Sequence, residues 1–159
     1  MIFGVGEYGA STAPGEELRT LALGSCVAVA IIDRATGAVG MAHIVFPDSS
    51  VSADRAAEHP GYFADTAIPV LINTMEKLGR AAKGRNWRVK IAGGANVTDP
   101  MNTFSLGHRN VVAVRKALSK YDLEAVAEDV GGSFNRSVGI RVGAEVLTLT
   151  SCGRGSWEI

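Results

Sequence analysis

A cysteine and a histidine, each within an apolar run, are the residues of this 159-residue sequence whose types suggest chemistry. Cys26 lies in the run over residues 24–32, and His43 lies in a second run over residues 39–46. An imidazole next to a thiol takes up its proton and lowers its pKa from about 8.5, which gives a nucleophilic thiolate. The pair therefore indicates covalent catalysis by Cys26 with His43 as base, provided that the fold brings them together.

The residues between Cys26 and His43 predict how the two side chains meet. Both runs are rich in β-branched residues, and residues 33–37 between them are typical of a turn, so we expect a buried β-hairpin. If paired residue numbers sum to 69, Cys26 lies directly opposite His43, and a sum of 71 leaves the two diagonal on one face. A sum of 70 sends them to opposite faces.

Small and polar residues close to Cys26 add to the candidate site. Gly24 and Ser25 precede it, and they allow backbone N–H groups to approach a substrate closely, as an oxyanion site requires. Thr20 is the nearest upstream polar side chain that could orient the pair, although a threonine entering a strand usually has a structural role. Two plainer interpretations stay open, namely that Cys26 packs as a small core residue and that His43 is a hydrogen-bonded core histidine.

Further candidates lie in the second half of the chain. Arg109 and Arg136 each stand in a Gly- and Asn-rich segment that predicts a loop, where an arginine is either solvated or in contact with substrate. Asn110 is predicted to cap a helix and is the third substrate-binding candidate. We expect the segments around both arginines, together with residues 48–60, to form the rim of the site. The Gly-Gly pair at 93–94 lacks the lysine of a P-loop and predicts a tight turn.

Two helices are expected from apolar residues at helical spacing. The first runs from Thr66 as N-cap, with Pro69 in its first turn, to a stop at Gly79. The second begins at Asn110 and ends near Tyr121.

Strands are expected on either side of these helices, over residues 87–91, 123–130, 138–142 and 145–150. The last two are predicted to join through a type II′ turn at Gly143 and Ala144. Residues 48–60 are expected to form a loop, and residues 151–159 are not assigned. Strands that are partly linked by hairpins and partly separated by helices predict an α/β sandwich with a mixed sheet.

The composition predicts one domain spanning residues 1–159 and narrows its partners. The 16 basic and 16 acidic residues are scattered along the chain, so we expect no nucleic-acid partner. The longest uncharged apolar stretch, residues 20–32, is shorter than the roughly 20 residues that span a bilayer, so no membrane insertion is expected. Without a secretory pattern at its start, the chain is expected to be cytoplasmic, with Cys26 and Cys152 as free thiols and no metal site.

Several blocks of residues, in this order and spacing, resemble the CheD family of chemoreceptor glutamine deamidases. The resemblance covers the chain from about Gly4 to Val146. Its blocks are Thr-Leu-Ala-Leu-Gly-Ser-Cys-Val-Ala-Val at 20–29, Met-Ala-His-Ile-Val-Phe-Pro at 41–47, and the segments 62–68, 90–95, 107–110 and 128–132.

The resemblance implies a fold, an activity and a catalytic triad. The fold is the α/β sandwich of cysteine deamidases, also seen in a bacterial cytotoxic necrotizing toxin. The triad falls on Cys26 as nucleophile, His43 as base and Thr20 as third member. The implied reaction converts glutamine side chains on the cytoplasmic helices of methyl-accepting chemotaxis receptors to glutamate, through a thioester and with release of ammonia. It needs no cofactor, and a CheC-type phosphatase is an implied partner.

Two departures from the family pattern bear on substrate or partner preference. His108 stands where the family commonly has glutamate, and Asn135 stands where glycine is usual.

Two other functions stay open. One is a non-catalytic adaptor that binds receptors, and the other is a cysteine hydrolase acting on another bond, such as a peptidase or a transglutaminase.

Overall fold

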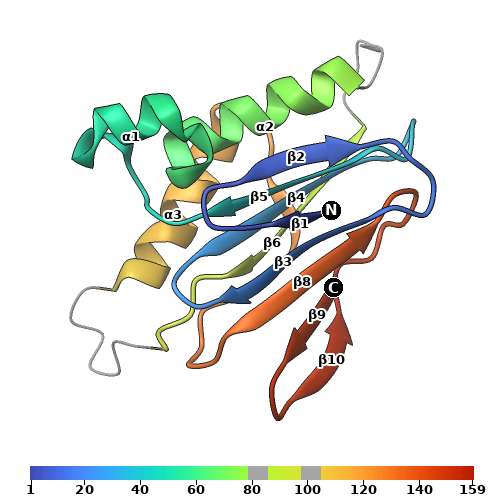
Figure 1. The fold of residues 1–159 in the computed structure, drawn as a ribbon. Coiled ribbons are helices and arrows are strands. Elements are labelled where there is room, and N and C mark those ends of the chain that lie inside the picture. The colour runs from blue at the N-terminus through green and yellow to red at the C-terminus, as the bar shows by residue number, and fades with distance from the viewer. Residues whose placement is uncertain (79–85, 98–104) are drawn as a thin grey trace.

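Two mixed β-sheets stack face to face, and helices cover the outer side of one of them (Figure 1). The computed structural model describes residues 1–78, 86–97 and 105–159. The first five-stranded sheet has the order β1 (Ile2–Phe3), β3 (Glu17–Leu23), β8 (Arg136–Arg141), β9 (Thr148–Ser151) and β10 (Gly155–Glu158). The second has the order β2 (Tyr8–Ser11), β5 (Val39–Ile44), β4 (Val27–Asp33), β6 (Trp87–Gly93) and β7 (Ala125–Val130). Parallel pairing of β1 with β3 and of β6 with β7 makes each sheet mixed, so the α/β class is confirmed.

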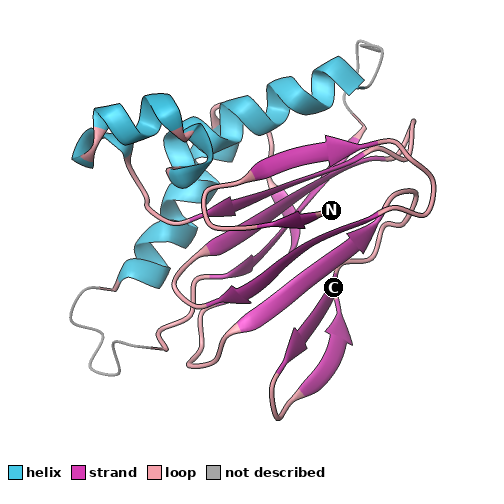
Figure 2. Ribbon diagram, viewed as in Figure 1, coloured by secondary structure: helices cyan, strands magenta, loops and turns pink. Residues whose placement is uncertain are grey.

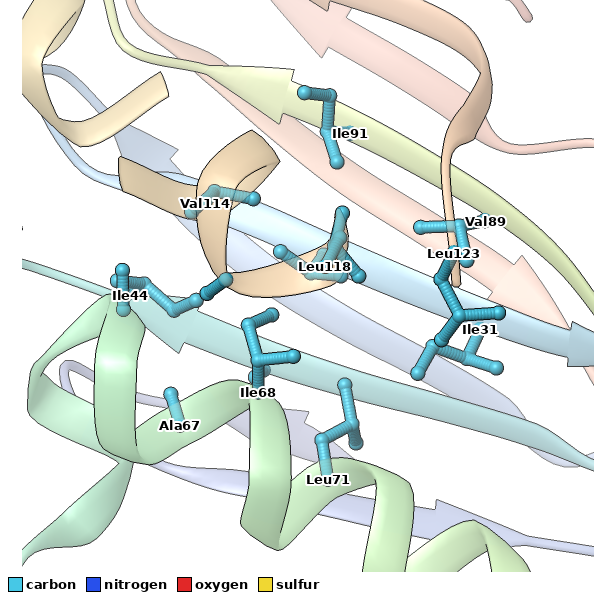
Figure 3. Packing of buried hydrophobic residues seen from close by; sticks show 14 of the residues in the cluster. Ile31, Ile44, Ala67, Ile68, Leu71, Val89, Ile91, Val114, Leu118 and Leu123 are labelled. Atoms are coloured by element: carbon cyan, nitrogen blue, oxygen red, sulfur yellow. The ribbon is translucent and has the colours of Figure 1, made fainter. Parts of the chain in front are cut away.

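The central strand β4 is buried along its whole length because it faces two cores. One set of its alternating residues packs under the helices α2 (Ala64–Leu78) and α3 (Leu106–Ser119), and the other set packs between the sheets. This double burial explains why the sequence of the strand is apolar without alternation. Figure 3 shows the helix-side core, where labelled residues include Ile31, Ile68, Leu71, Ile91, Val114 and Leu118.

The predicted hairpin is confirmed as the antiparallel pair β4 and β5. Ala28 pairs with His43 and Val27 with Ile44, so the paired numbers sum to 71. This is one of the two registers that place residues 26 and 43 on the same side of the sheet.

Residues 48–60 were expected to be a loop, and this prediction is wrong. They form the short helices η1 (Ser49–Val51) and α1 (Ala53–Glu58), and a third, η2 (Pro60–Tyr62), follows. The side chain of Asp48 accepts a hydrogen bond from Ser50 N at 2.7 Å, which caps the first of them. Ser49 Oγ donates to Asp65 at the start of α2 at 2.6 Å. These contacts fix a segment that has no apolar period of its own.

The predicted starts of both long helices are too late. Helix α2 begins at Ala64, so Pro69 lies inside the helix rather than in its first turn. Thr66 does not cap the helix, because its hydroxyl donates a hydrogen bond to Pro60 O at 2.6 Å. Helix α3 begins at Leu106, which places Asn110 within the helix rather than at its cap. The expected stop at Gly79 lies outside the described residues. All described helices lie on one side of the strands (Figure 2), and none of them is long and apolar enough to cross a bilayer.

The prediction of a two-residue turn at Gly143 and Ala144 is also wrong. Strands β8 and β9 do pair, but the last paired residues are Gly139 and Thr148, so the connection is longer than a hairpin turn. Gly143 N donates to Gly37 O at 2.9 Å, which docks this connection on the turn between β4 and β5. The unassigned C-terminal residues contain β10, which pairs with β9.

The central position of β4 gives a stability prediction. Ile31→Ala should lower the free energy of unfolding by about 2–5 kcal/mol, because it opens a cavity in the helix-side core. The matched control is Val126→Ala in β7, where the side chain is 50% exposed and the expected change is below about 1 kcal/mol. Denaturant unfolding measures both values, and equal losses in the two variants would contradict the central role of β4.

Candidate active site

A buried hydrogen bond between the two sheets forms the centre of the candidate site. His43 alternates in β5 with Ala42 and Ile44, which belong to the helix-side core, so its side chain faces the first sheet. There its Nδ1 lies 2.7 Å from the hydroxyl of Thr20 in β3. The same hydroxyl donates to Phe3 O at 2.9 Å. The side chains of Thr20 and His43 are both buried.

This hydrogen-bond chain selects one tautomer of His43. A threonine hydroxyl has a single proton, and here that proton goes to the carbonyl of Phe3. The oxygen therefore accepts the second hydrogen bond, so Nδ1 carries the proton and Nε2 carries the lone pair. Within the described part of the chain, the buried Nε2 has no hydrogen-bond partner. Of the two ring nitrogens, Nε2 is thus the one able to act as a base.

Cys26 lies where the chain crosses from one sheet to the other. It follows β3 of the first sheet and directly precedes β4 of the second. Its half-buried side chain packs against the core between the sheets, on the side that His43 also faces. The predicted proximity of thiol and imidazole therefore agrees with the register of the hairpin.

The backbone around Cys26 is held by the end of β6. Gly94 N donates to Cys26 O at 2.7 Å, and Ala95 N donates to Gly24 O at 2.8 Å. Gly93 has a φ of +111°, and a Cβ on it would lie 2.3 Å from Cys26 O, so no other residue fits this approach. The Gly-Gly pair, which was expected to form a tight turn, instead ends β6 and supports the segment that carries Cys26.

Two backbone N–H groups in this segment are available to a ligand. Among the described residues, the N–H groups of Ser25 and Cys26 have no backbone or side-chain oxygen as acceptor. The N–H of Cys26 instead acts on its own thiol, whose pKa it lowers. Donors of this kind stabilise the oxyanion of a tetrahedral intermediate.

Burial shifts both titrating groups toward their neutral forms. It raises the pKa of the Cys26 thiol, an effect that the N–H of the same residue opposes. It lowers the pKa of His43, opposed by the backbone of Phe3 and by the carboxylate of Glu7. At neutral pH the site therefore holds a thiol and a neutral imidazole. The lowered thiol pKa expected from the pair is not found in this state.

Arg136 does not lie in a loop, which corrects the prediction from its glycine-rich surroundings. It is the first residue of β8, it is 3% exposed, and its Nε donates to Asp129 at 2.6 Å. Trp157 Nε1 donates to the same carboxylate at 2.7 Å. The guanidinium also stacks on the ring of Phe134. A buried and paired guanidinium joins the strands and is not exposed to a substrate.

The other two candidates for substrate contact lie side by side in α3 but differ in exposure. Asn110 is fully buried, and its Nδ2 donates to Ser25 O and to Val45 O, each at 2.8 Å. Arg109 is exposed in the same turn, where a loop was expected. It lines a groove of about 420 Å³ together with His108 and other residues of α3, and Asp48 lines the same groove from the start of η1. Arg109 is therefore the member of the three that a large ligand can reach.

Some residues of the site gave no signal in the sequence. Phe3 contributes only its carbonyl, and the carboxylate of Glu7 acts on His43 from a neighbouring turn. Ser137 Oγ accepts a hydrogen bond from Ala22 N at 3.2 Å, where Ala22 has a φ of +55°. A non-glycine residue at positive φ marks a backbone held by its surroundings. The bend between Thr20 and Cys26 is thus imposed by the first sheet.

The fold and site define a class of protein before any comparison is made. A cysteine whose neighbouring backbone N–H groups have no oxygen acceptor among the described residues, on the same side as an oriented histidine, is the arrangement of cysteine-dependent acyl-transfer enzymes. Comparison with known proteins gives the family. Residues 45–150 match the family described as CheD chemotactic sensory transduction, so the chain belongs to the CheD family.

Full-length relatives agree with this assignment. The chain is 42% identical over 159 residues to a protein of Syntrophotalea carbinolica named "Probable chemoreceptor glutamine deamidase CheD", covering 100% of this chain and 98% of the relative. It is 38% identical over 154 residues to the "Chemoreceptor glutamine deamidase CheD" of Thermotoga maritima, covering 97% and 93%.

The lowered pKa of His43 predicts a loss of stability in mild acid. The unfolded chain, with an ordinary histidine pKa of about 6.5, binds a proton more readily than the folded site does. The free energy of unfolding should therefore fall as the pH drops below about 6.5. His43→Gln should show a shallower fall between pH 7.5 and 5. Identical pH dependence in parent and variant would mean that His43 titrates normally in the folded protein.

The Thr20 hydroxyl should stabilise both the fold and the Nδ1–H form of His43. Thr20→Val removes a hydrogen bond to the buried Phe3 carbonyl and should cost about 1–3 kcal/mol of unfolding free energy. Thr20→Ser keeps the hydroxyl and is the control, with a loss below about 1.5 kcal/mol. Ring ¹⁵N NMR should show protonated Nδ1 in the parent and in the serine variant. A valine variant as stable as the parent would contradict a stabilising role for the hydrogen bonds of the Thr20 hydroxyl.

Proposed function

We propose that this chain is a cytoplasmic protein-glutamine deamidase of methyl-accepting chemotaxis receptors, with a triad of Cys26, His43 and Thr20. The observation that carries the proposal is the Thr20–His43 hydrogen bond. It leaves Nε2 unprotonated and, among the residues that the structure describes, without a partner, in the layer between the sheets where Cys26 also packs. Membership of the CheD family and the printed names of the relatives support the receptor as substrate.

The first half of the reaction follows from these groups. Nε2 of His43 takes the Sγ proton while sulfur attacks the carboxamide carbon of the glutamine. The N–H groups of Ser25 and Cys26, next to Gly24, hold the oxyanion of the tetrahedral intermediate. The imidazolium then gives its proton to the leaving nitrogen, ammonia departs, and a thioester on Cys26 remains.

The second half regenerates the enzyme. Nε2, neutral again, takes a proton from water as the water attacks the thioester carbon. The second tetrahedral intermediate collapses, Sγ recovers the proton from the imidazolium, and the product is a glutamate side chain. No cofactor takes part in these steps.

The neutral resting pair suits this sequence. The thiol pKa is raised and the histidine pKa is lowered, so proton transfer accompanies attack rather than preceding it. An imidazolium formed in a buried place is a strong acid, which favours protonation of the departing nitrogen. The carboxylate of Glu7 offsets part of the cost of forming that cation.

Recognition must accept a glutamine displayed on an intact helix. We propose that Arg109 and the helical segment 48–60 contact that helix, because both are exposed over much of their length. Asn110, the neighbour of Arg109, bonds to Ser25 O, so this turn of α3 adjoins the catalytic segment. His108, on the same groove, is where a departure from the family pattern would alter partner preference.

Two finer points belong to the same proposal. The stack of two mixed sheets under helices supports a sandwich of the cysteine deamidase type. A CheC-type phosphatase as partner follows from the family resemblance alone.

Peptidase, transglutaminase and adaptor functions predict different products: cleavage, cross-linking and no product, respectively. Mass spectrometry of a glutamine-bearing receptor fragment separates all of them from deamidation.

Removal of the nucleophile tests the chemistry. Cys26→Ala deletes one half-buried sulfur atom, so it should change the unfolding free energy by less than about 1.5 kcal/mol while abolishing ammonia release. Cys152→Ala is the matched control, because Cys152 is the exposed cysteine and should keep full activity. Ammonia is measured with a receptor fragment as substrate. Continued deamidation by the Cys26 variant would end the proposal.

A further inference from the structure

The buried side chain of Asn110 joins two strands that otherwise separate. Its Nδ2 donates to Ser25 O and Val45 O at 2.8 Å each, although these acceptors lie 85 and 65 positions away in sequence. Its Oδ1 has no partner among the described residues. The amide therefore faces the strands with its donors, since the opposite orientation would set an oxygen against two carbonyls.

These two carbonyls lie just beyond the end of the β4–β5 ladder. Val27 pairs with Ile44, so the next pair would be Cys26 with Val45. This pair does not form, because Val45 N donates to Tyr62 O at 2.9 Å and β5 turns toward η2. The Asn110 amide occupies the gap and supplies hydrogen bonds to both strands.

The bond to Ser25 O sets the direction of the following N–H group. In a trans peptide the C=O and the N–H point in opposite directions. Because Ser25 O points toward α3, Cys26 N–H points away from the helix layer, to the side between the sheets. The effect of this N–H on the thiol of the same residue agrees with that direction.

Helix α3 also contacts Gly94, the second residue that binds the segment around Cys26. A Cβ on Gly107 would lie 2.3 Å from Gly94 O, so the helix backbone touches the turn after β6. Gly94 N in turn donates to Cys26 O. The peptide units on both sides of Cys26 are therefore fixed by α3, one through Asn110 and one through Gly94.

We propose that Asn110 is a positioning residue that aims the N–H of Cys26 at the oxyanion of the reaction. This role rests on the proposed deamidation. Asn110 does not touch the substrate, so its loss should reduce kcat and leave KM nearly unchanged. This role replaces the substrate contact expected of Asn110.

The experiment compares Asn110→Asp and Asn110→Ala with Val114→Ala. Val114 is equally buried, one turn further along α3, in the helix-side core. Kinetics of ammonia release from a receptor fragment should show kcat lowered about 100-fold in both Asn110 variants, with KM within about threefold. Val114→Ala should lower the unfolding midpoint while keeping kcat within about threefold of the parent.

Alkylation of Cys26 by iodoacetamide distinguishes positioning from collapse of the site. Displacement at the iodoacetamide carbon develops no oxyanion, so the limiting alkylation rate at high pH, where the Cys26 thiol is ionised in parent and variants alike, should change less than about threefold in the Asn110 variants. Parallel losses of alkylation and ammonia release would overturn the proposal, as would an unchanged kcat. An inactive parent would instead overturn the proposed function, and this inference with it.

A measurement on the parent protein covers the case in which the variants do not fold. Hydrogen exchange of the Asn110 side-chain amide, followed by NMR, should be slow for both protons because each is buried in a hydrogen bond. Exchange at the rate of an exposed asparagine would overturn the proposal without any variant.

Discussion

The hydrogen bond from His43 Nδ1 to the Thr20 hydroxyl connects the chemistry of this protein to its architecture. It joins β5 of one sheet to β3 of the other at a buried point, where a polar group left unpaired would be costly. Because the hydroxyl proton goes to Phe3 O, one bond fixes both the ring orientation and the tautomer of His43. The orientation and the tautomer of His43 therefore depend on the stacking of the two sheets.

Burial has a second consequence at the same point. Desolvation keeps the Cys26 thiol and the His43 imidazole neutral, and it leaves Nε2 without a partner in the described structure. An unsatisfied buried acceptor destabilises the fold, and such groups are concentrated at functional sites. In the proposed reaction Nε2 takes up the proton of the Cys26 thiol, which satisfies this acceptor. In that reaction Cys26 stays protonated until a substrate is attacked.

The segment that carries Cys26 crosses between the sheets and is held from several directions. Gly94 and Ala95, just after β6, donate hydrogen bonds to its carbonyls. Asn110 binds it from α3, and Ser137 of β8 holds the preceding bend. Arg136 belongs to a separate set of contacts, in which Asp129 of the second sheet binds a side chain from the first. The two sheets and a helix therefore position Cys26 and His43, while Arg109 lies on an exposed part of α3.

The sequence alone determined the hairpin and its burial, because the side-chain period of strands shows which residues share a face. It limited Cys26 and His43 to a few registers, and the structure has one of those that bring them together. Only the tertiary structure decided the partner of Thr20, the burial of Arg136 and the hydrogen bonds of Asn110. Each of these depends on how the two sheets stack or on where α3 packs against them, and local periodicity in the sequence does not give that placement.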